Sequence, residues 1–71
     1  MKYAAIIEKR PTSDGATVPD LPGCAAVGET LEEAEALIRE AIDFHIKGLR
    51  ADGESIPLLT TIYEYVETQA A

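Results

Sequence analysis

The chain has 71 residues, of which 46% are hydrophobic and 27% are charged, and its net charge is −7 at pH 7. A chain of this length forms a single domain, predicted over residues 1–71, and buries only about 60% of the surface that its unfolded form exposes, so self-association is the expected extra source of stability. The negative charge disfavours nucleic-acid binding, which needs clustered Lys and Arg, and no run approaches the roughly 20 apolar residues of a membrane span.

Three short strands are predicted in the first part of the chain. Lys2–Lys9 has apolar residues on both faces, as a central strand does. The segment Arg10–Gly15 (RPTSDG) has the composition of a turn, and Ala16–Pro19 is predicted as the second strand of a hairpin. Cys24–Gly28 (CAAVG) is predicted as a third strand, whose small residues let a helix lie close over the sheet.

A corner with the sequence PDLPG separates the second and third strands. Pro22 sets the φ angle that the second position of a type II turn requires, and Gly23 supplies the positive φ of the third position. The Asp20 carboxylate can accept a hydrogen bond from a nearby backbone N–H, as in an Asx-turn. We expect this corner to aim the third strand at the N-terminus of the following helix.

The clearest element is a helix over Thr30–Asp52. Thr30 is a favourable N-cap, and Glu33 three residues later completes a capping box. Gly53 suits the position after the last turn, and Pro57 forbids continuation. Apolar residues recur at helical spacing at Leu31, Ala34, Ile38, Ala41, Ile42 and Leu49.

The last predicted strand is Leu59–Thr68 (LTTIYEYVET), rich in residues that favour a pleated sheet. The resulting order β-β-β-α-β predicts an α+β fold: an antiparallel three-strand meander, a crossover helix on one face, and a fourth strand parallel to the first and beside it. The expected spatial order is 3-2-1-4. The other face of the sheet is left partly bare, which is a second argument for a partner.

The sequence offers little catalytic chemistry. Cys24 has no predicted histidine neighbour and is interpreted as a small buried hydrophobe, while His45 lies in the apolar stripe of the helix and is expected to pack there. The acidic residues between Glu29 and Asp43 fit a solvated helix face rather than a metal site. We expect no metal, no cofactor and no enzyme activity. The remaining enzyme alternatives are a vestigial metal nuclease and a Cys-dependent enzyme. The unpaired thiol and the lack of an export signal predict a cytoplasmic protein.

The stretch VPDLPGCAAVGETLEEAEALIREAI resembles the signature of the HicB-like antitoxin family, and YAAIIEK and DGESIP extend the resemblance over essentially the whole chain. The signature combines a Pro-Asp-Leu-Pro-Gly-Cys corner, a Gly-x-Thr and two Glu-Ala pairs, the second of which is Glu40-Ala41. Its other residues here are Pro19, Asp20, Leu21, Pro22, Gly23, Cys24, Gly28, Thr30, Glu33 and Ala34.

This resemblance implies a partial RNase H-like fold and an antitoxin of a type II toxin–antitoxin system. The implied partner is a HicA-like toxin, a small basic protein with a double-stranded-RNA-binding-domain fold that cleaves mRNA, whose RNA-cleaving surface the antitoxin covers. A homo-oligomer, dimer or tetramer, is expected. The toxin-binding residues that we expect are Asp20, Glu29, Glu32, Glu35, Tyr63 and Tyr65.

The chain departs from the family pattern at its end. Many HicB antitoxins carry a C-terminal helix-turn-helix or ribbon-helix-helix domain, whereas this sequence stops at Ala71, after the fourth predicted strand. We therefore expect this domain not to bind DNA directly. The alternative function is an orphan homo-oligomeric regulatory or scaffolding module without a toxin.

Overall fold

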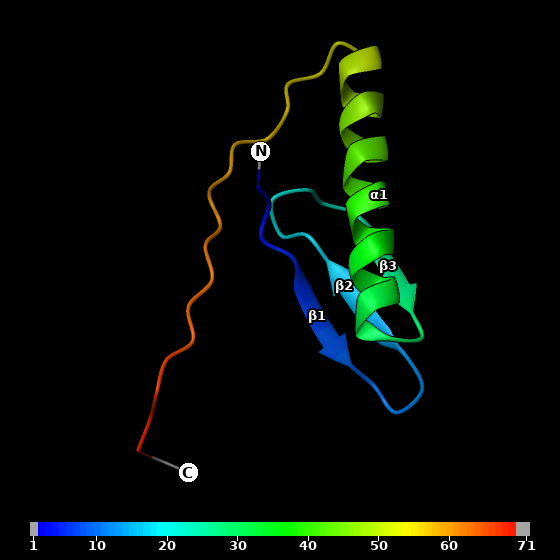
Figure 1. Ribbon diagram of the computed structural model, residues 1–71. Coiled ribbons are helices and arrows are strands. Elements are labelled where there is room, and N and C mark those ends of the chain that lie inside the picture. Colours follow the sequence, from blue (N-terminus) through cyan, green and yellow to red (C-terminus); the bar gives the residue numbers. More distant parts are fainter. Residues whose placement is uncertain (1, 70–71) are drawn as a thin grey trace.

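The computed structural model describes residues 2–69 of the chain. Three strands form one antiparallel sheet in the order β1-β2-β3, and a helix covers one face of it (Figure 1). This confirms the predicted α+β class, the meander and the placement of the helix. The elements are β1 (Ile6–Lys9), β2 (Asp14–Thr17), β3 (Ala25–Gly28) and α1 (Leu31–Ala51).

Alternation along the strands separates a covered face from an open one. Ile7, Ala16 and Ala26 lie opposite one another in the register and pack into or against the core beneath α1. Ile6 and Val27 belong to the other face and stay 50% and 59% exposed. The sheet therefore has the uncovered face expected from the sequence, and Ile6 and Val27 are apolar residues exposed on it.

Both ends of α1 are closed by bonds within the chain. At the start, the Thr30 hydroxyl accepts a hydrogen bond from the Glu33 backbone N–H at 3.1 Å. At the end, Gly53 has φ +70° and its N–H donates to the Arg50 carbonyl, while the Glu54 N–H donates to the Leu49 carbonyl, which is a Schellman motif. The predicted helix limits are confirmed, and no helix within residues 2–69 is long and apolar enough to cross a bilayer.

The strands are shorter than predicted, and the second is displaced. The first was expected over Lys2–Lys9 but pairs only over Ile6–Lys9, because the chain opposite leaves the sheet at Val18 to form the corner. The second runs over Asp14–Thr17 rather than Ala16–Pro19. Residues 10–13 make the turn, with the Arg10 N–H donating to the Ser13 carbonyl at 2.8 Å.

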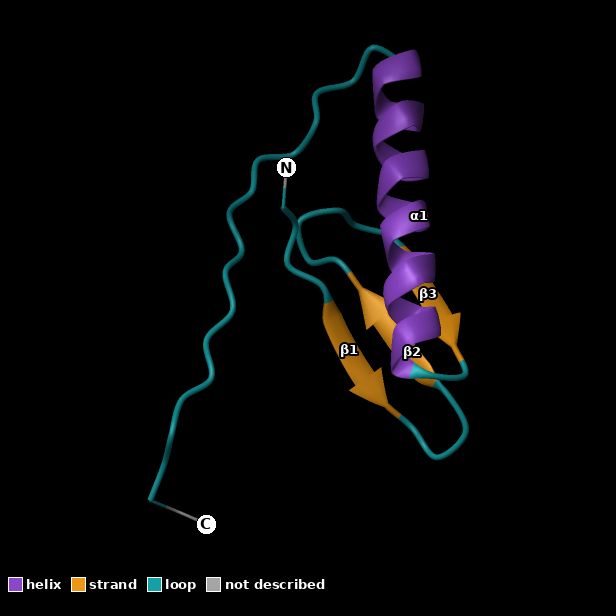
Figure 2. Cartoon of the chain, in the orientation of Figure 1, coloured by secondary structure: helices purple, strands orange, loops and turns teal. Residues whose placement is uncertain are grey.

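The prediction of a fourth strand over Leu59–Thr68 was wrong for this structure. Residues 54–69, which we call the tail, are extended but belong to no strand (Figure 2). They leave the end of α1 as a separate segment, and we call the rest of the described chain, residues 2–53, the body. The backbone N–H groups of Thr60 and Thr61 donate to a side chain instead of to a neighbouring strand. The RNase H-like fold therefore stays a prediction, whereas the three-stranded part of it is observed.

The extended tail makes the molecule long. Its radius of gyration is 14.0 Å and its extents are 48 × 27 × 17 Å, whereas a compact domain of this length has a radius of gyration of about 11 Å. The tail descends on the side of β1 and in the same direction as that strand (Figure 1). It thus lies on the side of β1 that pairs with no other strand of residues 2–69.

Candidate functional site

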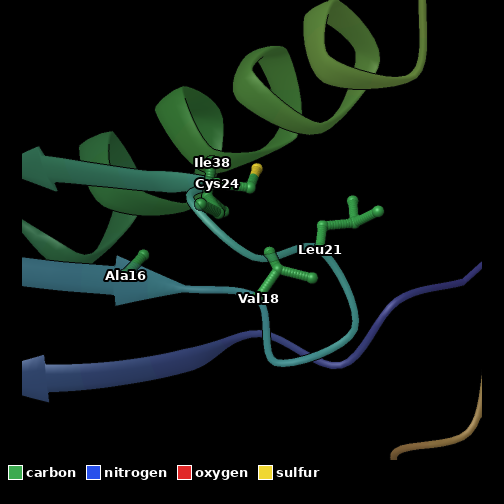
Figure 3. Close-up of a cluster of buried hydrophobic side chains, with 5 residues drawn as sticks. All are labelled: Ala16, Val18, Leu21, Cys24 and Ile38. Atoms are coloured by element: carbon green, nitrogen blue, oxygen red, sulfur yellow. The ribbon is translucent and has the colours of Figure 1, made fainter. Parts of the chain in front are cut away.

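The corner after β2 is a hydrogen-bonded turn that buries Leu21 and Cys24 and leaves Pro22 and Gly23 exposed. The Leu21 N–H donates to the Val18 carbonyl and the Cys24 N–H donates to the Leu21 carbonyl, each at 3.0 Å. Gly23 has φ +84°, which is the angle that a type II turn requires at its third position. The Leu21 side chain is fully buried in a cluster with Val18, Cys24, Ala16 and Ile38 (Figure 3). The corner predicted from Pro22 and Gly23 is therefore confirmed, and it also forms much of the core.

Asp20 faces away from this cluster and binds the tail. Its carboxylate accepts bonds from the backbone N–H groups of Thr60 and Thr61, at 3.0 and 2.9 Å, and from their hydroxyls, at 2.9 and 2.6 Å. These bonds, those of Thr61 first, lower the pKa of the carboxyl below its ordinary value because they favour the charged form. We call this arrangement of Asp20, Thr60 and Thr61 the clasp.

A second contact holds the tail above the clasp. The Tyr3 hydroxyl donates to the Pro57 carbonyl at 3.1 Å. The segment from Pro57 to Thr61 is thus bonded to the body at each of its two ends. Residues 62–69, which we call the arm, have no hydrogen bond to the body within the part of the chain that the structure describes. The arm is also apolar at its surface: Ile62, Tyr63, Tyr65 and Val66 are all at least 74% exposed.

An open groove of about 720 Å³ separates the start of the arm from the body. Its walls come from the residues before and within β1, from one side of α1 and from the tail. The apolar part of the lining consists of Tyr3, Ala4, Ala5, Ile7, Ile38, Ile42, Ile62 and Tyr63, and the charged part of Lys2, Arg39, Glu35 and Asp43, with Thr61 at the clasp. This groove is larger than the hollows of about 300 and 110 Å³ that lie elsewhere on the described residues. The charges of its lining residues cancel, although the protein as a whole is acidic.

The start of α1 carries exposed carboxylates that are partly used by the fold. The Glu29 N–H donates to the Glu33 carboxylate at 3.3 Å, so the capping box reaches one residue before the N-cap. A Cβ built on Gly28 would come within 2.5 Å of the Ala34 backbone nitrogen. The Gly-x-Thr and Glu-Ala parts of the sequence signature therefore serve this strand-to-helix junction.

The predicted interaction residues do not form a single cluster. Glu35 and Tyr63 line the groove, and the Tyr65 ring lies edge-on to that of Tyr63 with centroids 5.9 Å apart. Glu29 and Glu32 are exposed at the start of α1 and are not among the residues that line the groove.

The prediction for Asp20 was wrong in one respect. Its carboxylate binds no nearby backbone group of its own turn but a segment 40 residues later. Sequence reasoning missed Thr60 and Thr61 as the partners of Asp20, and it missed the bond from Tyr3 to Pro57. The adjacent threonines offered a weak signal, since paired hydroxyl and N–H donors suit a carboxylate, but nothing in the spacing connected them to Asp20.

The residues with catalytic potential lie apart from the groove. Cys24 is buried beneath α1 as predicted, and burial raises the pKa of its thiol, which makes it a poor nucleophile. His45 is half-buried on α1. Within residues 2–69 no group of three His, Cys, Asp or Glu side chains is arranged to hold a metal ion. What residues 2–69 do present is a groove and an exposed apolar arm, which are surfaces suited to binding.

Comparison with known proteins gives a consistent assignment. Residues 3–70 match the family described as HicB_like antitoxin of bacterial toxin-antitoxin system. The chain is 44% identical over 68 residues to a 14.9 kDa protein from the rep-hol intergenic region of Haemophilus phage HP1, a match that covers 93% of this chain and 50% of the phage protein. This chain therefore spans about half the length of that relative.

Two shorter relatives match over most of their own length. A UPF0150 protein of Thermoplasma acidophilum is 45% identical over 60 residues, covering 80% of this chain and 84% of the relative. A UPF0150 protein of Helicobacter pylori is 44% identical over 52 residues, covering 73% and 72%. No solved structure matches the chain.

Proposed function

The chain belongs to the HicB-like antitoxin family of bacterial toxin–antitoxin systems, and on this premise we propose that it neutralises a HicA-like, mRNA-cleaving toxin by direct protein contact. The observation that carries the proposal is the family match over residues 3–70. A net charge of −7 supports it, because a protein that binds RNA presents a basic surface, which an acidic protein attracts and covers.

The proposed contact surface combines acidic and aromatic groups. Exposed Glu29 and Glu32 lie at the start of α1, and Glu35 lies one turn further along the helix at the groove. Tyr63 and Tyr65 supply the large amphipathic rings that are frequent at interface centres. Asp20 acts indirectly, since its carboxylate is occupied by Thr60 and Thr61 and thereby positions the tail that carries both rings.

The test uses the full chain and a small basic HicA-like toxin. Co-expression should restore growth that the toxin alone arrests, and the two purified proteins should form a complex whose affinity falls with rising salt. Glu35→Lys should weaken the complex at least ten-fold, because it places a positive charge at the surface that faces the basic partner.

The matched control is Glu54→Lys, which makes the same change of charge at an exposed position beyond α1. It should weaken the complex by no more than about three-fold, which is the effect expected from the change in net charge alone. If both variants lost the same amount of affinity, binding would depend on the net charge of the protein and not on the surface around Glu35. Failure to form a complex at low salt, together with no rescue of growth, would refute the antitoxin role.

A further inference from the structure

The solvent-accessible surface of the molecule is larger than that of a compact monomer of the same mass. Its accessible surface is 5762 Å², whereas a compact monomer of 7.6 kDa has about 4,300 Å². The excess of about 1,500 Å² is larger than the ~800 Å² that each partner contributes to a standard interface. Much of the excess comes from the tail, whose apolar side chains are exposed. This amount of surface is what a tightly bound partner covers.

The described chain has both an extended segment and a free strand edge that could pair with a further strand. The arm offers an extended backbone with alternating side chains, and β1 is an edge strand whose outer backbone groups have no partner strand. The arm does not close on its own β1, since the groove lies between Ile62–Tyr63 and the stretch that leads from Lys2 into Ile7. An unpaired edge and an unpaired extended segment are each templates for a further strand.

We propose that a second copy of this chain fills the groove by inserting its arm as a strand between β1 and the arm of the first copy, so that two copies exchange arms reciprocally. A two-fold axis perpendicular to the sheet gives the order β1, partner arm, own arm, partner β1. Because the arm runs in the same direction as its own β1 (Figure 1), the inserted arm runs antiparallel to both of its neighbours. Antiparallel pairing is slightly more stable per residue than the parallel closure within one chain.

The charges of the groove suit an acidic arm. The arm carries Glu64 and Glu67 and no basic residue. The groove is lined by Lys2 and Arg39 as well as Glu35 and Asp43, so it is neutral overall on a protein with a net charge of −7. The acidic arm therefore meets no net charge of its own sign in the groove. Its Ile7, Ile38 and Ile42 can cover the apolar side chains that the arm exposes.

The groove also holds Glu35 and Tyr63 of the proposed toxin surface, so the exchanged dimer is the state of the chain without toxin, and the two partners compete for this groove. The exchange is tested on the purified full chain without any toxin, so its failure is distinct from failure of the antitoxin role. Native mass spectrometry and light scattering should give twice the 7.6 kDa chain mass. Val66→Asp, at a side chain that is 77% exposed, should raise the dimer dissociation constant at least ten-fold and leave the helical circular dichroism intact. Phe44→Asp is the control, because that ring is 80% exposed on α1 and does not line the groove, and it should remain dimeric.

Disulfide trapping separates exchange from closure within one chain. Glu8→Cys places a thiol on β1 and Glu64→Cys places one on the arm; when the two singly substituted chains are mixed and oxidised, a cross-linked pair should form. The parent chain, whose Cys24 is buried, should give none. A monomeric parent, a dimer that survives Val66→Asp, or a mixture of the two singly substituted chains that gives no cross-linked pair would overturn the proposal.

Discussion

Residues 6–53 and residues 54–69 obtain their conformations in different ways. In the first region each change of direction is closed by bonds between near neighbours, such as the turn at Leu21–Cys24 and the capping bonds at both ends of α1. In the second, the bonds to the body come from Tyr3 and Asp20, and the arm beyond them is exposed. Residues 6–53 pack around a buried core, whereas residues 54–69 expose apolar side chains that the rest of the described chain does not bury.

The sharpest test of this difference compares two leucines. Leu21→Ala should lower the free energy of unfolding by about 2–5 kcal/mol, because the side chain is fully buried and its removal leaves a cavity. Leu58→Ala, at a side chain that is 79% exposed, should change it by less than about 0.5 kcal/mol. Urea unfolding followed by circular dichroism measures both. Similar losses would show that the tail shares the core of the body.

The second comparison probes the junction between β3 and α1. Gly28→Ala should cost about 1–3 kcal/mol, since the added Cβ would lie 2.5 Å from the Ala34 backbone nitrogen and backbone must move to admit it. Gly48→Ala meets nothing within 4 Å and should instead raise the free energy of unfolding by about 0.5–1 kcal/mol, the gain of alanine over glycine in a helix. Thermal melts of both variants give opposite signs if the close approach is real.

The sequence was most informative where a local pattern determines local structure. Thr30 and Glu33 predicted the start of α1, and Pro22 and Gly23 predicted the turn, because capping and turn geometry depend on residues only a few positions apart. Strand limits were less accurate. The Asp14-Gly15 dipeptide indicates a turn in isolation, yet here it begins β2, because pairing with Lys9 and Glu8 overrides the local preference.

The tail could not be predicted from local pattern. The alternation in Ile62–Val66 correctly indicates an extended backbone, but an extended segment becomes a strand only when an edge pairs with it. Which edge pairs with it, in this chain or another, depends on contacts far apart in the sequence. Glu35 and Tyr63 line the groove, but their role in binding stays a prediction, and no local pattern in the sequence predicted the groove itself.

A smaller effect is expected at the capping box. Thr30→Ala should lower the free energy of unfolding by about 1 kcal/mol, because the Glu33 N–H loses its acceptor. Thr68→Ala, at an exposed position of the arm, removes a hydroxyl from the tail and should have no measurable effect in the same urea titration. A loss at Thr68 that equals the loss at Thr30 would contradict the division between the two regions.

The finest distinction lies in how the clasp depends on pH. Hydrogen bonds from Thr61 and Thr60 lower the pKa of Asp20 below its ordinary value of 3.8, so the charged carboxylate is favoured in the folded protein. Its contribution is fully present above that ordinary value and is lost as the pH falls through the lowered pKa. The protection factors of the Thr60 and Thr61 amides, measured by NMR hydrogen exchange relative to the intrinsic rate at each pH, should therefore fall on acidification below about pH 3.8, before those of the α1 amides do.

Asp20→Asn removes this titration and leaves a single oxygen to accept bonds from four donors. In that variant the two threonine amides should exchange rapidly at neutral pH and show no further change on acidification, while the amides of α1 keep their protection. Glu54→Gln, an exposed acid in the tail, should retain the acid-dependent step. Threonine amides that stay protected in Asp20→Asn would mean that the tail is held by its own packing, and residues 54–69 would then belong with the body.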